Sequence, residues 1–213
     1  MHQSTKAYLP AAGEDWALPF YDPMTRLMGA DATRRQLLDQ APLAPGDRVL
    51  DIGCGTGTLA VLIKRLHPTV DVVGLDPDPR ALARARKKAE RAGVSVHFDR
   101  GFSDDLPHPS AAFNRVFSSL MFHHVEGDDR PNTLREVRRV LKPGGSFHLV
   151  DFSRPAAKHG LKHLLCASAH FKDNSDARIL ELFQQAGFSS PQKTAEATMF
   201  FGLLRLAFFS ASA

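Results

Sequence analysis

A glycine-rich segment is the part of the sequence whose residue types point most directly to chemistry. A β-like run from Val49 leads into glycines at alternate positions, Gly53, Gly55 and Gly57, and then into a helical pattern that starts at Thr58. Because glycine lacks a Cβ atom, such a backbone turns tightly and approaches a ligand closely, while the next helix offers its first amide groups. The segment is therefore predicted to cradle a nucleotide.

Details around this segment indicate which nucleotide it binds. A dinucleotide fingerprint has glycine at the last position of G-x-G-x-x-G, where this chain has Thr58, and no Gly-Lys-Ser/Thr ending marks a triphosphate loop. Asp51 lies two positions before the first glycine, where a negative charge disfavours a pyrophosphate and favours an ammonium or sulfonium group. Asp76, 19 residues after Gly57, follows the next β-like run at a distance suited to accepting both ribose hydroxyls. The alternative for Asp76 is a turn residue before Pro77.

A doubly covered parallel sheet is the scaffold that the rest of the pattern predicts for these residues. Short apolar runs alternate with amphipathic stretches that carry helix stop signals, which is typical of a βαβα chain. The ligand crevice of such a sheet lies beyond the carboxyl ends of its strands. Strands are expected at 48–52, 71–75, 95–98, 115–119 and 146–151, and helices at 58–66, from the cap Asp78 to Gly93, and at 133–141 before Pro143-Gly144-Gly145.

Two regions flank this core, which is placed at 46–155 of a single domain that covers 1–213. The region 1–45 is predicted to form a lid, with one helix at about 24–40 behind an aromatic loop that contains Tyr21. The region 156–213 is expected to supply acceptor-side helices and an edge hairpin. Its predicted elements are a helix at 176–186 and two β-like runs, at 191–197 and 203–210, that pair as antiparallel strands.

Composition excludes several classes of protein. The chain has 27 Lys and Arg against 23 Asp and Glu, a net charge of +4, and its basic run at 84–91 is more typical of an exposed helix face than of a nucleic-acid site. Cys54 and Cys166 form no disulfide framework and no signal peptide follows Met1, so the cytoplasm is the expected compartment. The apolar stretch 199–211 is too short for a membrane span.

In their order and spacing, these residues resemble the class I S-adenosylmethionine (SAM)-dependent methyltransferases. The resemblance is to the small-molecule branch that includes the ubiquinone and menaquinone C-methyltransferases, and it covers about 21–154. It implies a Rossmann-like three-layer sandwich with a seven-stranded sheet, six strands parallel and one antiparallel. Its elements are 49–57 (VLDIGCGTG), 74–76 (GLD), 101–107, 141–145 (LKPGG) and the tyrosine-aspartate start at Tyr21-Asp22-Pro23.

The resemblance implies SAM as the cofactor and S-adenosylhomocysteine (SAH) as the product. The three glycines would face the methionine part, Asp76 the ribose, and the loop 101–103 the adenine. Many relatives have aspartate in place of Phe102, so ring stacking on the adenine is expected here instead of a hydrogen bond. Asn114 replaces a commonly structural aspartate. The candidate cofactor-binding residues are Tyr21, Asp51, Gly53, Cys54, Gly55, Thr56, Gly57, Asp76, Pro77, Gly101, Phe102, Ser103 and Ser119.

Catalysis needs few side chains, because SAM brings its own activated methyl group and the protein mainly aligns the acceptor and excludes water. A phenol, enol carbon or protonated amine must also lose a proton, and His123 and His124, after the fourth strand, are the candidate bases. Tyr21 is a third candidate, which would close over the cofactor or bind the acceptor. The alternatives are local packing or solvation of the histidines and simple lid packing of Tyr21. The histidine pair also differs from the quinone enzymes, so a quinone acceptor is not assumed.

Two further patterns have ordinary explanations. His159, His163, Cys166 and His170 share one helical face with zinc-like spacing, but Gly160 weakens that helix and the resembled family needs no metal, so no metal site is predicted. The apolar tail after 199 is expected to be the buried hairpin. A dimer contact or a dock for a lipid-like acceptor stays open, and with it a monomer or homodimer and a peripheral membrane contact.

The sequence therefore predicts methyl transfer from SAM to carbon, oxygen or nitrogen of a small organic acceptor. Two alternatives remain. The first is a nicotinamide-dependent oxidoreductase, which Thr58 disfavours. The second is a non-catalytic SAM-binding or partner-regulating protein, which the altered position Phe102 slightly favours.

Overall fold

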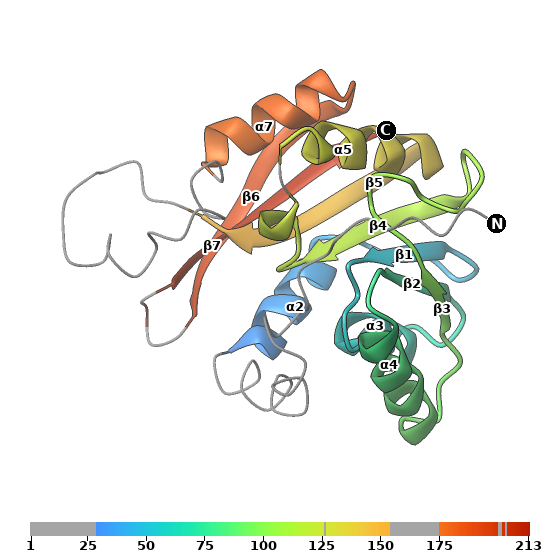
Figure 1. The fold of residues 1–213 in the computed structure, drawn as a ribbon. Helices are drawn as coiled ribbons and strands as arrows, with labels where there is room; N and C mark the ends of the chain where they lie inside the picture. Colours follow the sequence, from blue (N-terminus) through green and yellow to red (C-terminus); the bar gives the residue numbers. More distant parts are fainter. Residues whose placement is uncertain (1–28, 126, 154–174, 200–201, 203) are drawn as a thin grey trace.

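The computed structural model describes residues 29–125, 127–153, 175–199, 202 and 204–213, and its seven strands form one sheet in the order β3-β2-β1-β4-β5-β7-β6 (Figure 1). β7 is antiparallel to both of its neighbours, and the other six strands are parallel. The strands are β1 (Arg48–Ile52), β2 (Asp71–Asp76), β3 (His97–Arg100), β4 (Phe113–Ser119), β5 (Leu141–Phe152), β6 (Ser189–Met199) and β7 (Leu204–Ser212).

Helices cover both faces of this sheet, as Figure 1 shows. α5 and α7 pack on one face, where Leu134 and Phe183 join an apolar cluster with Phe147 of β5. α2, α3 and α4 lie on the other face, where Leu37 and Leu82 join a second cluster. The helices are α2 (Ala30–Asp39), α3 (Thr58–Leu66), α4 (Pro79–Arg91), the short 3-10 helix η2 (Phe122–His124), α5 (Asp129–Val140) and α7 (Asp176–Gln185). The predicted three-layer sandwich with six parallel strands and one antiparallel strand is confirmed.

The helical boundaries in the first half follow from local sequence signals. α4 begins after Asp78, whose carboxylate accepts a hydrogen bond from the Arg80 amide, and Pro79 occupies its first turn. Gly93, with φ of 66°, follows its end. The predicted bounds of β1 and α3 agree with the structure to the residue.

Other boundaries differ from the prediction. Gly29 has φ of 94°, a left-handed conformation, and α2 begins after it at Ala30; the part of the predicted helix before residue 29 lies outside the described residues. β3 lies two residues later than expected, because it pairs with β2 as far as Asp76. α5 begins four residues earlier than expected, at Asp129.

The predicted role of the LKPGG segment, residues 141–145, as a helix stop is wrong. Pro143-Gly144-Gly145 does not end α5, which stops at Val140; these residues lie inside the irregular start of β5. The register between β4 and β5 shifts there, from Phe113 opposite Leu141 to Arg115 opposite Ser146. The glycines thus accommodate a bulge within a strand.

The apolar tail is core. β7 lies between β5 and the edge strand β6, and Phe208 and Phe209, both fully buried, point into opposite clusters. The predicted hairpin is therefore confirmed as an ordinary part of the sheet. Among the described residues, none of the helices is long and apolar enough to cross a membrane.

Candidate functional site

The carboxyl ends of β2, β1, β4 and β5 meet at one edge of the sheet (Figure 1). Ile52 at the end of β1 pairs with Leu75 and with Ser118, and Ser119 pairs with Val150. The side chains that end or follow these strands therefore lie beside one another, although they come from distant parts of the sequence. The glycine segment starts from this edge, as the position of a ligand crevice requires.

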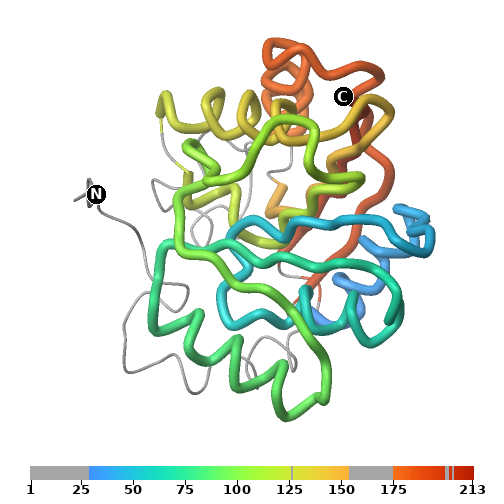
Figure 2. The backbone as a smooth tube through the Cα atoms, turned by 90° about the vertical axis from the view of Figure 1, so that its right-hand side faces the viewer, coloured from blue at the N-terminus to red at the C-terminus, as the bar shows by residue number. Residues whose placement is uncertain are grey.

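The three glycines of the segment all adopt left-handed backbone conformations, with φ of 64° at Gly53, 52° at Gly55 and 74° at Gly57. A Cβ atom on Gly57 would lie 2.8 Å from the Cβ of Ala85, and one on Gly53 would lie 2.1 Å from the Cγ of Met121. Glycine is thus required at these positions both by the turn and by packing against the protein itself. Figure 2 shows the same turn as a backbone tube leading from β1 into α3.

Asp76 ties the glycine segment to the end of β2. Its Oδ2 accepts a hydrogen bond from the Gly55 amide at 2.8 Å, and its Oδ1 accepts one from the Asp78 amide at 2.9 Å. Burial raises the pKa of this carboxyl to about 6, against the lowering effect of the two amides. Each carboxylate oxygen has a further lone pair, so both can still accept hydrogen bonds from a ligand. The Gly101 amide contacts the Asp76 carbonyl at 3.3 Å, which brings the predicted adenine loop to the same place.

Asp51 is a buried residue whose carboxyl group is only partly hydrogen-bonded. The residue is 1 % exposed, and Oδ2 of its carboxyl has no hydrogen-bond partner among the described residues. Burial, with a smaller contribution from nearby Asp76, raises the pKa of this carboxyl to about 7 against the lowering effects of Arg34 and the Ala60 amide. Two acids at this edge favour a cationic group between them, which is what the sequence predicted for the ligand.

Several predicted cofactor residues turn their side chains toward the protein. Thr56 accepts a hydrogen bond from Lys88 at 3.0 Å, and the hydroxyl of Ser103 lies 2.9 Å from that of Thr133. Burial raises the pKa of the Cys54 thiol well above its usual value, so this cysteine is no nucleophile. The side chains of Thr56 and Ser103 thus hold the loops to neighbouring helices.

The remaining predicted cofactor residues occupy the same edge. The carbonyl of Pro77 accepts a hydrogen bond from Arg100 at 3.2 Å. Phe102 pairs with Asp105 in a short antiparallel bridge that shapes the loop. The hydroxyl of Ser119 is buried without a partner among the described residues, which makes it a second polar atom that a ligand would satisfy.

His123 forms a buried pair with Asp151, a residue that was not among the predicted site residues. His123 Nδ1 lies 2.7 Å from Asp151 Oδ1, and the His123 amide donates to Oδ2 at 2.8 Å. The Phe152 amide donates to Oδ1 at 2.7 Å. Because a carboxylate oxygen only accepts hydrogen bonds, Nδ1 is the donor in its contact with Asp151.

His124 lies beside this pair, with the two histidine rings tilted by 40° and their centroids 4.0 Å apart. The ring of Phe152 meets His123 edge-on at 4.9 Å and so fixes its orientation. Met121, also not predicted, covers Gly53 at the entrance to the same edge. The signal for Asp151 was present in the sequence, as an acid at the carboxyl end of the strand next to the one that precedes the histidines.

Some predicted residues lie outside the described part of the chain. They are Tyr21, with the rest of the lid, and the histidine and cysteine face made of His159, His163, Cys166 and His170. Within the part that the structure describes, no group of three His, Cys, Asp or Glu residues could hold a metal ion.

Comparison with known proteins gives consistent matches. Residues 49–145 match the sequence model of a family described as a methyltransferase domain. The chain is 39% identical over 140 residues to a demethylmenaquinone methyltransferase of Thermus thermophilus, covering 64% of this chain and 63% of the relative. It is 32% identical over 154 residues to the 27-O-demethylrifamycin SV methyltransferase of Amycolatopsis mediterranei, covering 70% and 56%.

The fold is also shared with solved structures. A SAM-dependent methyltransferase from Aquifex aeolicus superposes with a TM-score of 0.66 at 18% identity, covering 84% of this chain and 88% of that one. The matched part of this chain spans less than two thirds of the length of the curated relatives.

Proposed function

We propose that this chain transfers a methyl group from SAM to a small organic acceptor, a function that the match of residues 49–145 to a methyltransferase-domain model supports. The observation that carries this proposal is the pair of buried carboxyls, Asp51 and Asp76, on either side of a glycine turn. Burial keeps the pKa of both carboxyls raised even with Arg34 near Asp51, and a positively charged nucleoside offsets the remaining cost. When bound, SAM supplies a methyl group on a positively charged sulfur, and this methyl group is the electrophile of the reaction.

The two acids have different tasks in this proposal. Asp76, already fixed by the Gly55 and Asp78 amides, receives the ribose hydroxyls. Asp51, with its unpartnered oxygen, faces the cationic part of the ligand. The loop at 101–103 borders the adenine, and Tyr21 closes over the cofactor or contacts the acceptor.

We assign proton removal from the acceptor to His123. Asp151 holds the imidazole with its proton on Nδ1, so that Nε2 is directed toward other groups, and it stabilises the imidazolium that forms on proton uptake. Phe152 keeps water from one side of the ring. His124, 4.0 Å away, lines the acceptor space in this assignment.

A phenolic or quinol ring is the acceptor class that these features favour. Such a ring must lose a proton for methylation at carbon or oxygen, which gives a histidine base a purpose. The names of two relatives, a demethylmenaquinone methyltransferase and a 2-phytyl-1,4-naphtoquinone methyltransferase, point to the same chemistry. The partner in this proposal is a small molecule.

The test is a transfer assay with SAM that carries a labelled methyl group and a panel of reduced naphthoquinols, phenols and amines. We expect label in the quinol or phenol products and equimolar SAH. His97→Asn, an exposed histidine that also faces a carboxylate, is the matched control and should retain full activity. Tight SAH binding without transfer to any member of the panel would support the non-catalytic alternative and overturn the proposal.

A further inference from the structure

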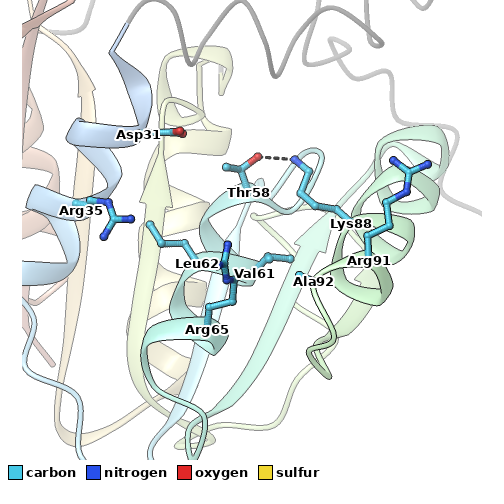
Figure 3. Close-up of a pocket in the computed structure, with 9 residues that line it drawn as sticks. All are labelled: Asp31, Arg35, Thr58, Val61, Leu62, Arg65, Lys88, Arg91 and Ala92. Carbon is cyan, nitrogen blue, oxygen red and sulfur yellow. Dashed lines mark hydrogen bonds between the residues drawn. The ribbon is translucent and has the colours of Figure 1, made fainter.

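A groove lies beside the cofactor edge, on the outer side of α3. It has a volume of about 380 Å³ and is bounded by α2, α3 and α4 (Figure 3). Apolar side chains from Val61, Leu62 and Ala92 form part of its surface. Figure 3 shows Arg35 of α2 and Lys88 of α4 approaching the groove from opposite sides, with Arg65 of α3 between them.

The groove concentrates positive charge. Four of its lining residues are cationic, Arg35, Arg65, Lys88 and Arg91, and one, Asp31, is acidic. Asp31 is engaged by Arg34 at 3.3 Å. Within the described part of the chain, Arg35, Arg65 and Arg91 form no ion pair with an acidic side chain.

This arrangement differs from an ordinary solvated helix face. The charges come from three different helices and surround one concavity, so their fields add inside it. Lys88 is also fixed in place, since its Nζ donates to the Thr58 hydroxyl at 2.6 Å and to the Thr56 hydroxyl at 3.0 Å. The guanidinium groups of Arg35, Arg65 and Arg91 repel one another across this space, and an anion there removes the repulsion.

We propose that this groove binds a small molecule that carries a phosphate or diphosphate group and an apolar or aromatic part. Guanidinium groups match phosphate oxygens with paired hydrogen bonds, which assigns the anion to Arg35 and Arg65. The volume is in the range of pockets for small molecules, and the apolar surface of Val61 and Leu62 suits the rest of such a ligand. This site is separate from the carboxyl-lined edge assigned to SAM and does not depend on the proposed function.

The test uses inorganic pyrophosphate, titrated calorimetrically into the full chain. We expect saturable binding at one site. Arg35→Gln combined with Arg65→Gln should weaken it by at least roughly tenfold, since two charged hydrogen-bonding groups are lost. The matched control combines Arg84→Gln with Lys87→Gln, two exposed α4 residues outside the groove lining, which removes the same charge and should change affinity less than about twofold.

Other outcomes would overturn the proposal. Equal weakening by both double variants would mean diffuse electrostatic attraction without a site. Absence of pyrophosphate binding at millimolar concentration, or binding only to vesicles that contain phosphatidylglycerol, would exclude a small-molecule pocket. Thermal melts establish that the variants fold, and Arg91→Gln, a third exposed lining residue, gives an independent reading of the same site.

Discussion

The two halves of the candidate site are built in different ways. On the cofactor side, Asp51 and the three glycines lie within one short segment, and Asp76, 21 residues after Gly55, joins them through the Gly55 amide because β2 pairs with β1. On the acceptor side, His123 and Asp151 are 28 residues apart and meet only because β4 and β5 are neighbours in the sheet. The glycine turn is therefore encoded locally, whereas its contact with Asp76 and the proposed base both depend on which strands are neighbours.

Removing the proposed base should have the largest effect on the acceptor side. We expect His123→Asn to lower kcat by about 10² to 10⁴, because general-base catalysis contributes that much, and to leave SAH affinity unchanged. Asp151→Asn should also lower kcat, because an amide no longer fixes the ring with its proton on Nδ1. Transfer assays paired with SAH calorimetry measure both quantities. An unchanged kcat in His123→Asn would contradict the assignment of the base to the acceptor side of the site.

A matched pair of glycines tests how far local packing dictates the cofactor side. Gly57 and Gly144 have nearly equal φ, 74° and 76°, but a Cβ on Gly57 would meet Ala85 at 2.8 Å, while one on Gly144 would meet nothing within 4 Å. We expect Gly144→Ala to lower the free energy of unfolding by ~1 kcal/mol through backbone strain. Gly57→Ala should lower it by ~2 to 4 kcal/mol, since steric overlap adds to that strain. If denaturant titrations showed an equal loss of unfolding free energy for the two variants, the side chains around Gly57 would accommodate a Cβ atom without cost.

Loss of the ribose acceptor is the next largest effect. Asp76→Ala should weaken SAM and SAH binding by ~1.5 to 3 kcal/mol, because charged hydrogen bonds are lost. The same change removes the acceptor of the Gly55 and Asp78 amides, so the melting temperature should fall as well. Calorimetry at saturating ligand separates the two effects. Unchanged affinity would contradict the ribose assignment.

The pH dependence of cofactor affinity should show the smallest change. With a pKa of about 7, Asp51 becomes ionised as pH rises, so SAM affinity should increase by about tenfold between pH 6 and pH 8. A smaller increase for SAH, which lacks the sulfonium charge, would place Asp51 beside the sulfur, and an equal increase would place it beside the ammonium group. A flat profile for wild type would contradict the role of Asp51.

Asp51 also predicts an opposite trend in stability. Its folded-state pKa lies above the ordinary value of 3.8, so the folded protein holds the proton more tightly and loses stability as pH rises from about 4 through 7. Asp51→Asn should therefore stabilise the ligand-free protein at pH 8 more than at pH 5, in thermal melts at the two values. The same variant should flatten the SAM profile.

Sequence patterns were sufficient where structure depends on neighbours in the chain. The bounds of β1 and α3 follow from one apolar run and one left-handed glycine, and the edge hairpin follows from alternation in two runs. The predicted helix runs through Gly29 because the apolar pattern continues there. A pattern of residue types does not show the left-handed backbone of that glycine. The prediction that Pro143-Gly144-Gly145 ends a helix is wrong because these residues form a bulge against β4. The local sequence does not show which strand is the partner.

The site shows the same limit. Spacing alone is enough to place the glycines, Asp51 and Asp76 at this edge of the sheet, whereas placing Asp151 and Met121 there requires knowledge of which strands are adjacent. The side chains of Thr56 and Ser103 were expected at the cofactor, but Lys88 and Thr133 engage them, and such cross-helix contacts leave no periodic trace in the sequence.

Direct titration of the purified chain with SAH tests the central claim most directly. One-to-one binding at micromolar concentration, abolished or strongly weakened by Asp76→Ala and unaffected by His123→Asn, is the predicted result. No heat of binding with either SAH or SAM at millimolar concentration would contradict the assignment of the glycine turn and its two acids to this cofactor.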